Sequence, residues 1–173
     1  MTTQEATLIA AVIAAIASVA RLVFDRFAER RSSMRELLQP LIAEMGEAVY
    51  GIVATSTVLV EAETPEKLRA WYAKACRERE KLKAIRPKLR YPLWGLDEGI
   101  RALQHLPDWC SHARSNRQRA AAMLKHATAL RHMIDITALR CYRNGRQPDL
   151  LERAQVRYHA WRCRKFFTDG RPE

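Results

Sequence analysis

The sequence predicts an all-α protein, in which an N-terminal transmembrane helix continues into a stem and then a cytoplasmic bundle of about four to five helices. Three observations lead to this fold class. Residues 6–24 are almost entirely apolar. Apolar residues recur at helical spacing through the rest of the chain, between capping signals and prolines. The chain is basic, with a formal net charge of +11, and the excess lies after residue 63.

The run from Ala6 to Phe24 has the length of a membrane-spanning helix, which needs about 20 mostly apolar residues. Its large apolar residues favour insertion by roughly 3 to 5 kcal/mol in total, whereas a central arginine would cost about 2.5 to 3.5 kcal/mol. Arg21 lies near one end, where its side chain can reach the headgroups. The predicted spanning residues are Leu8, Ile9, Val12, Ile13, Ile16, Val19, Leu22, Val23 and Phe24.

Three other kinds of apolar N-terminal segment are alternatives to a membrane span. A core helix of a soluble protein or soluble assembly is also apolar on every side, and it would be enclosed by later helices. A helix lying in the membrane interface requires a polar face, which this run lacks. A cleavable signal peptide requires a positively charged start, and residues 1–5 contain no lysine or arginine.

The flanking charges predict an orientation. No basic residue precedes the apolar run, and five arginines (Arg21, Arg26, Arg30, Arg31 and Arg35) lie at its end or follow it. By the positive-inside rule, the N-terminus lies outside and the C-terminal domain lies in the cytoplasm. We therefore expect a single-pass protein of the inner (cell) membrane.

One face of the predicted span carries small residues four apart: Ala6, Ala10, Ala14 and Ser18. Small residues at this spacing let two helix backbones approach closely in lipid, so this face is the predicted site of homo-oligomerisation. An alanine-rich composition alone would produce the same pattern.

The domain boundaries follow from the next proline. Residues 1–38 are predicted to form the anchor and its juxtamembrane stem, residues 39–167 the basic helical bundle, and residues 168–173 a flexible tail. Pro40 is expected to end or kink the stem, because its ring removes a hydrogen-bond donor and clashes one turn back. The next helix should begin at Pro40 and reach about Val60.

Capping signals and prolines divide the remainder into helices. Thr64 and Pro65 open a helix that Pro87 should stop near Ile85. A short helix over about 93–106 should end in a turn at Pro107, with a short helical piece following to about residue 114. Asn116 caps a long helix from 117 to about 142, which Asn144 and Gly145 terminate. Pro148 and Asp149 open the last helix, with Ala154, Tyr158 and Trp161 on its apolar face.

The excess positive charge predicts a basic surface, carried chiefly by the last helix: Arg153, Arg157, Arg162, Arg164 and Lys165. Such a surface attracts an anionic lipid leaflet, an acidic protein partner or nucleic acid. In residues 86–95, Tyr91 and Trp94 alternate with basic residues, as in segments that bind phosphate and stack on bases or lie at headgroups. Alternatively, Trp94 fills the core.

No cofactor and no metal site is expected. The four cysteines are scattered singly on different segments, and no Cys-x-x-Cys pair or set of four convergent ligands occurs. On the cytoplasmic side of a membrane they should be free thiols.

Arg119 and His126 are two turns apart on the long predicted helix, with six residues between them. This spacing resembles the Arg-x(4–6)-His motif of HEPN-family ribonucleases, whose fold is a helical bundle. The resemblance implies that the arginine would stabilise charge on phosphorus while the histidine moves a proton. It covers only these two residues, and Ala120 follows Arg119 where the family usually has a polar residue.

Taken together, these patterns favour a non-enzymatic, membrane-anchored helical adaptor or effector that self-associates and presents a basic cytoplasmic surface. Three other functions fit parts of the sequence: a membrane-permeabilising effector, a nucleic-acid-binding helical protein, and a ribonuclease of the kind just described.

Overall fold

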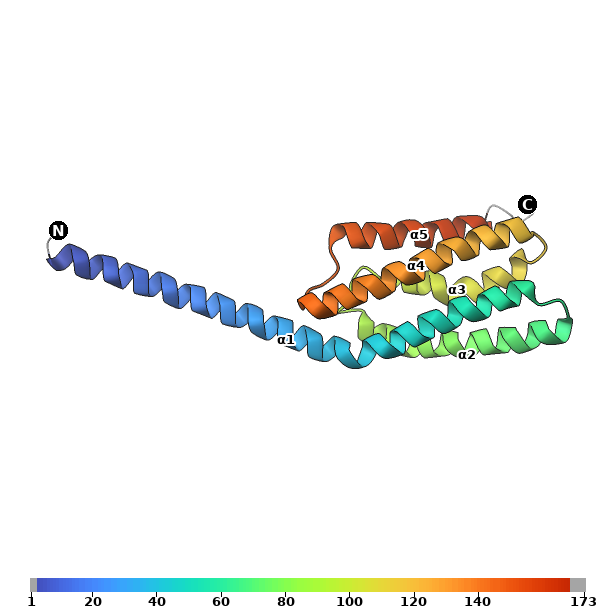
Figure 1. Cartoon of the computed structure of the whole chain (residues 1–173), viewed down its shortest axis with the longest axis horizontal. Coiled ribbons are helices and arrows are strands. Elements are labelled where there is room, and N and C mark those ends of the chain that lie inside the picture. The colour runs from blue at the N-terminus through green and yellow to red at the C-terminus, as the bar shows by residue number, and fades with distance from the viewer. Residues whose placement is uncertain (1–2, 169–173) are drawn as a thin grey trace.

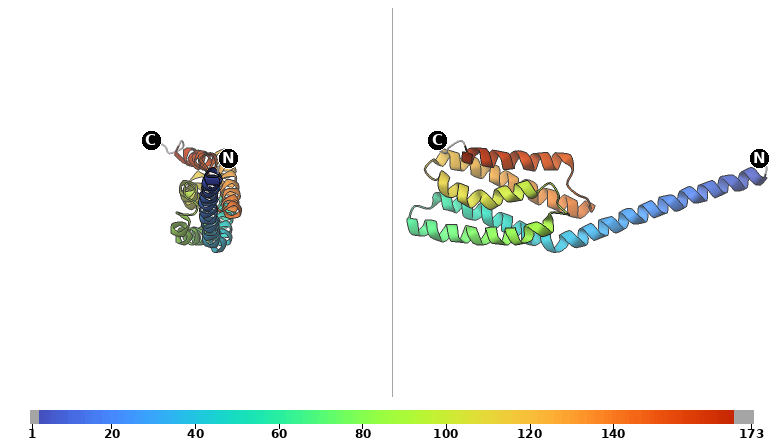
Figure 2. Two further views of the ribbon diagram at one scale, coloured as in Figure 1. Left: turned by 90° about the vertical axis from the view of Figure 1, so that its left-hand side faces the viewer. Right: turned by 180° about the vertical axis from the view of Figure 1, so that it is seen from behind.

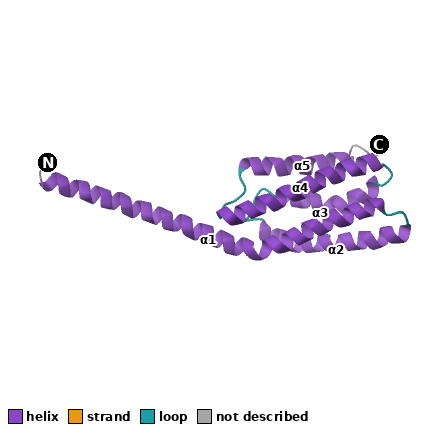
Figure 3. Ribbon diagram, in the orientation of Figure 1, coloured by secondary structure: helices purple, strands orange, loops and turns teal. Residues whose placement is uncertain are grey.

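The computed structural model describes residues 3–168, and the side chains of residues 13–167. Five helices follow one another: α1 (Thr3–Glu61), α2 (Pro65–Leu89), α3 (Asp97–Ala113), α4 (Arg117–Asn144) and α5 (Leu150–Thr168). Short loops connect them, and residues 3–168 contain no strand (Figure 3). The predicted all-α fold with a long apolar N-terminal helix is therefore confirmed.

The two halves of α1 have different surroundings. Its N-terminal half projects from the molecule as a single rod, and its C-terminal half runs through the bundle (Figures 1 and 2). No residue from 13 to 37 is buried, and burial begins at Leu38. From there Leu38, Met45, Ile52 and Leu59 recur every seven residues and are completely or almost completely buried. This heptad spacing keeps one face of α1 against α2, α3 and α4.

Pro40 does not end α1, so the predicted new helix at this position is wrong. The helix continues through it and changes direction near this point (Figure 1). A proline inside a helix costs about 3 kcal/mol or more. Here Leu38 and Leu41 are buried on either side of the proline, and their packing holds the helical path. Burying one such side chain stabilises the fold by about 1.5–3 kcal/mol, so two offset the cost.

Pro87 and Pro107 also lie inside helices, which corrects two further boundaries. α2 continues past the predicted stop to Leu89, and α3 runs unbroken from Asp97 to Ala113, so the predicted turn at Pro107 is absent. Buried residues again flank each proline: Ile85 and Leu89 in α2, Leu106 and Trp109 in α3. Tertiary packing overrides the local preference in all three helices.

The helix ends that were predicted from capping residues are confirmed. The Thr64 hydroxyl accepts a hydrogen bond from the Lys67 N–H at 3.3 Å, and the Asn116 side chain accepts one from the Arg119 N–H at 3.1 Å. Gly145 closes α4 in the left-handed conformation, with φ of 58°. The polar residues and glycine at these positions satisfy backbone groups that a helix end leaves unpaired.

The buried face of α5 differs from the prediction. Val156, Ala160 and Cys163 are buried, together with Glu152, whereas the predicted apolar residues Ala154, Tyr158 and Trp161 are exposed. The buried positions lie about four residues apart and are mostly small, because α5 packs closely against α3 and α4. The four cysteines are free thiols, as predicted, and three of them are buried.

Candidate membrane anchor and basic surface

The predicted spanning residues of α1 whose side chains the structure describes are not covered by the bundle. Ile16 is 64 % exposed and Phe24 is 75 % exposed. The other predicted residues in the described part (Ile13, Val19, Leu22 and Val23) are also exposed. The side chains of Leu8, Ile9 and Val12 lie outside the described residues. A series of exposed large apolar side chains along one helix indicates a surface that contacts lipid or another protein.

By length and composition, α1 is a helix that could span a membrane. Among the described side chains, the 18-residue stretch of α1 that is apolar enough, with a mean hydropathy of 1.2, is 39 % buried. Residues 13–37, in contrast, contain no buried residue. That stretch must therefore include the bundle half of α1, where apolar residues fill the core. The exposed apolar segment from Ile13 to Phe24 is physically different, because none of the described helices packs on it.

The small-residue face is exposed where the structure describes it. Ala14 and Ser18 are both exposed, and the Ser18 hydroxyl donates a hydrogen bond to the Ala14 carbonyl oxygen at 2.8 Å. This bond satisfies the hydroxyl within its own helix, as a lipid environment requires. The side chains of Ala6 and Ala10 lie outside the described residues.

The stem joins the bundle at the C-terminal end of α4. The Arg35 guanidinium donates a hydrogen bond to the Arg143 carbonyl oxygen at 2.6 Å. Gly145 packs directly on the Arg31 backbone, and a Cβ added to this glycine would lie 2.6 Å from the Arg31 Cα. The stem is thus held at two points before the core of α1 begins at Leu38. The sequence contains no signal for these contacts, since the partners are far apart along the chain.

The five residues of the predicted basic surface do not form one free cationic face. Arg153 lies over the Trp94 ring at 4.3 Å and donates to the Pro148 carbonyl oxygen. Arg157 pairs with Glu98 at 3.5 Å. Arg162 bonds to His126. Arg164 and Lys165 are exposed at the C-terminal end of α5, where the Lys165 ammonium lies 5.4 Å from the Trp161 ring.

Trp94 does not fill the core, which corrects the alternative prediction for residues 86–95. It is 55 % exposed, and Tyr91 is exposed beside it, while Leu89, Leu93 and Leu96 supply the buried apolar contacts. The Gln147 amide donates to the Tyr91 carbonyl oxygen at 3.0 Å, so the loop between α4 and α5 lies against this turn. Both aromatic rings are therefore on the end of the bundle that also holds the stem junction.

Arg119 and His126 make different contacts. The Arg119 guanidinium donates to the carbonyl oxygens of Phe166 and Phe167, and so caps the end of α5. His126 Nδ1 lies 3.2 Å from His159 Nδ1, and Arg162 Nε donates to His126 Nε2 at 3.3 Å. No hydrogen bond or ion pair joins Arg119 to His126 in the described part. Burial lowers the pKa of His126, and the positive charge of Arg162 lowers it further.

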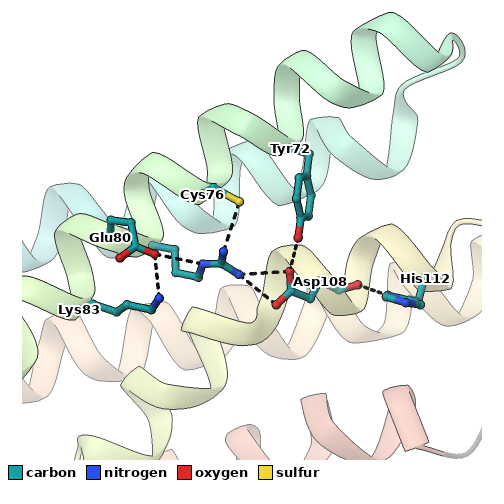
Figure 4. Close-up of polar contacts among 7 residues, drawn as sticks. Tyr72, Cys76, Glu80, Lys83, Asp108 and His112 are labelled. Atoms are coloured by element: carbon teal, nitrogen blue, oxygen red, sulfur yellow. Dashed lines mark hydrogen bonds and ion pairs between the residues drawn. The ribbon is translucent and has the colours of Figure 1, made fainter.

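The structure contains a polar cluster between α2 and α3 (Figure 4). The sequence pattern did not predict it. The Tyr72 hydroxyl donates to Asp108 Oδ1 at 2.5 Å, and the Arg79 guanidinium donates to both oxygens of the same carboxylate, at 3.2 and 3.0 Å. The bond to Asp108 raises the pKa of Tyr72 to about 12. These bonds use both carboxylate oxygens, so the cluster serves as a clamp between two helices. Within residues 13–167, no three potential metal ligands converge.

A buried carboxylate fixes the loop before α5. Glu152 is 2 % exposed, and its side chain accepts hydrogen bonds from the Asp149 N–H at 2.9 Å and from both terminal nitrogens of Arg146 at 3.0 Å. The Glu152 N–H in turn donates to Asp149 Oδ1 at 2.8 Å. An acid three residues after an N-cap residue is the signature of a capping box, so this signal is present in the sequence.

Comparison of the chain with protein-family models, curated proteins and solved structures finds no match.

Proposed function

We propose that this chain is a non-enzymatic, single-pass, membrane-anchored helical adaptor or effector. Residues 6–24 would cross the inner membrane with the N-terminus outside, and the bundle would lie in the cytoplasm. In this arrangement the protein self-associates through its anchor and presents basic residues to an anionic partner.

The observation that carries the proposal is the exposed apolar rod. In a soluble core helix, Ile16, Leu22 and Phe24 would be covered by other helices, and here each is more than 60 % exposed. Lipid would cover these side chains at once. The charges after the rod add a second argument, because Arg26, Arg30 and Arg31 follow within one to two turns and would lie at the anionic cytoplasmic leaflet.

Membrane extraction tests the proposal on the full chain. After cell lysis, membranes are washed with high salt and then with alkaline carbonate, and we expect the protein to stay with the membrane until detergent is added. Ile16→Lys places a charge in the apolar run at a cost of about 2.5–3.5 kcal/mol, so this variant should appear in the soluble or carbonate fraction.

The matched control is Leu150→Lys, which makes a similar change at an exposed apolar residue of the bundle. This variant should remain with the membrane. Release of the unmodified protein by carbonate would contradict the spanning anchor, and release by salt alone would indicate attraction to the membrane surface only.

A further inference from the structure

A cavity lies where the stem of α1 meets the end of α4. Its volume is about 470 Å³, and its lining includes Phe27 and five arginines: Arg30, Arg31, Arg35, Arg143 and Arg146. Three of these arginines come from α1, one from the last turn of α4 and one from the loop after it. We refer to this space as the arginine cavity.

The walls of the arginine cavity are fixed by the surrounding fold. The stem is held by the packing of Gly145 on Arg31 and by the hydrogen bond from Arg35 to the Arg143 carbonyl oxygen. Arg146 is held by its two bonds to the buried carboxylate of Glu152. Two of the five guanidinium groups are therefore held in place before a ligand binds, which lowers the entropy cost of binding.

The positive charge in the cavity is not balanced by the protein. No acidic residue is part of its lining. Arg146 pairs with Glu152 and Asp149, whereas Arg30, Arg31 and Arg143 have no acidic partner in the described part of the chain. The C-terminal end of α4 contributes the equivalent of about half a negative charge, which cannot offset several guanidinium groups. An anion with more than one charge would balance the site.

Phosphate is the anion that this set of donors fits best. The planar guanidinium group presents paired N–H donors that match two phosphate oxygens, and arginine is for that reason common in phosphate sites. The volume falls within the range of about 300–1,000 Å³ that is usual for small-molecule sites, so it can hold more than one phosphate group.

The place of the cavity along α1 indicates the source of the phosphate. Arg31 follows Phe24, the last residue of the apolar run, by seven positions, which is about 10 Å along a helix. The polar layer on each side of a bilayer is roughly 5–8 Å thick. The Arg31 backbone would therefore lie just beyond this layer. Because helix side chains lean toward the N-terminus, the guanidinium groups of Arg30 and Arg31 would reach back to the lipid phosphates of the cytoplasmic leaflet, with the exposed rings of Phe24 and Phe27 on the bilayer side.

We propose that the arginine cavity binds the phosphate groups of an anionic phospholipid headgroup that carries at least two negative charges. This proposal rests on the membrane anchor proposed above. Bound lipid would fix the bundle at a set distance from the bilayer, because the cavity contains residues of both the stem and α4.

The test uses the full chain in non-ionic detergent micelles, with cardiolipin as the diphosphate lipid, phosphatidylcholine as the neutral lipid and inorganic pyrophosphate as the soluble probe. Binding is measured by native mass spectrometry. The test variant is Arg31→Gln with Arg143→Gln, since these two arginines have no acidic partner and glutamine keeps the Arg31 carbons that touch Gly145. We expect cardiolipin binding to weaken about tenfold or more, because at least one charge-assisted hydrogen bond to phosphate is lost.

The matched control is Arg69→Gln with Arg77→Gln, which removes the same charge from two exposed positions outside the cavity. This variant should keep cardiolipin binding within about twofold, since surface charge contributes little to a specific site. Equal losses in both variants would overturn the proposal in favour of general charge attraction. So would equal binding of cardiolipin and phosphatidylcholine.

Pyrophosphate separates the two sources of phosphate. Binding of pyrophosphate as tight as that of cardiolipin would overturn the assignment to lipid and leave a soluble polyphosphate as the ligand. Carbonate extraction separates this proposal from the previous one. If the protein resists carbonate and the test variant binds cardiolipin as well as the unmodified protein, the anchor stands and the arginine site is overturned. If carbonate releases the protein and the test variant still loses cardiolipin binding, the site stands and the anchor is overturned.

Discussion

Gly145 meets two independent constraints at one Cα. Its φ of 58° lies in the left-handed region, where a side chain is disfavoured. In addition, an added Cβ would lie 2.6 Å from the Arg31 Cα and 2.7 Å from the Arg31 Cβ. The first constraint ends α4, and the second lets the stem approach the bundle. One residue therefore sets both a helix end and the position of a distant segment.

Gly145→Ala should lower the free energy of unfolding by about 1–3 kcal/mol, from left-handed backbone strain and the clash with Arg31. Thermal unfolding followed by circular dichroism in detergent measures this. Gly46→Ala is the control, because nothing lies within 4 Å of its added Cβ and alanine is favoured inside a helix by about 0.5–1 kcal/mol. Equal destabilisation by both changes would contradict the close approach.

Only the first of these constraints could be predicted from the sequence. A glycine after the last helical residue is a local signal, and Asn144–Gly145 indicated the end of α4 correctly. The contact with Arg31 depends on how the stem and α4 meet in space, which neither residue periodicity nor capping encodes. The arginine cavity was missed for the same reason, because its arginines come from two separate parts of the chain.

His126 and His159 lie together between α4 and α5. Their Nδ1 atoms are 3.2 Å apart, and Arg162 from α5 faces His126. Burial lowers the pKa of both histidines, and Arg162, His159 and Lys125 lower that of His126 further. The remaining ring neighbours of His126, Tyr158 and Phe166, are uncharged. Both histidines should therefore be neutral in the fold at neutral pH.

Stability should fall as the solution becomes more acidic. In the unfolded chain the histidines take up protons near their ordinary pKa of 6.5, whereas the folded state binds them only at lower pH. The stabilising contribution is thus present above pH 6.5 and is lost as pH falls through the lower folded-state pKa values. Unfolding temperatures from pH 7.5 to 5 measure the effect. His159→Gln should flatten the curve, and His132→Gln, at an exposed position on α4, should leave it unchanged.

At the level of elements, the clamp between α2 and α3 depends on one carboxylate. Asp108 accepts bonds from Tyr72 and Arg79, and both donors belong to α2. Tyr72→Phe should cost roughly 1 kcal/mol, since it removes one hydrogen bond. Asp108→Ala should cost more, about 2–4 kcal/mol, because the partly buried Arg79 then loses its partner.

Chemical denaturation measures the free energy of unfolding of these variants, and a control at an exposed ion pair shows whether the cluster contributes more than ordinary surface pairing. Glu47→Gln removes an exposed partner of Lys81 outside this cluster and should change stability little, because exposed ion pairs are weak. If this control cost as much as Asp108→Ala, the α2–α3 cluster would have no special role.

Helix starts and helix interiors differed in how well the sequence predicted them. Thr64 and Asn116 marked starts correctly, because a cap is a local hydrogen bond. Pro87 and Pro107 indicated breaks, and Pro40 a break or a kink. No break occurs, because burial on both sides of each ring holds the helix, and only the change of direction near Pro40 remains. On α5 the large aromatics Tyr158 and Trp161 suggested the core face, but close packing selected Val156, Ala160 and Cys163. Such packing depends on neighbouring helices that the sequence pattern does not identify.

For the whole molecule, the sequence separates a projecting apolar segment from a bundle, and the structure has this division. The sequence pattern did not indicate that one uninterrupted helix, α1, belongs to both parts. Self-association through Ala14 and Ser18 would therefore act on the bundle directly. Ala14→Leu should weaken association in detergent by steric separation of the helix backbones, as measured by cross-linking.

Ala20→Leu is the matched control, because Ala20 lies on another side of the same helix. The control should cross-link as the unmodified protein does. Equal loss in both variants would show that the small-residue face has no particular role.

The unbroken path of α1 also fixes an angle. At about 100° per residue, Arg31 and Leu38 lie about 220° and 200° around the rod from Ser18. Two copies joined at Ser18 would thus carry their bundles on opposite outer flanks, with both arginine cavities turned away from the axis of the pair. One alanine inserted between residues 25 and 30 would rotate each bundle by about 100° around the helix axis relative to the anchors. The arginine cavities would then face a different direction, although no residue of the anchor or of the bundle is changed.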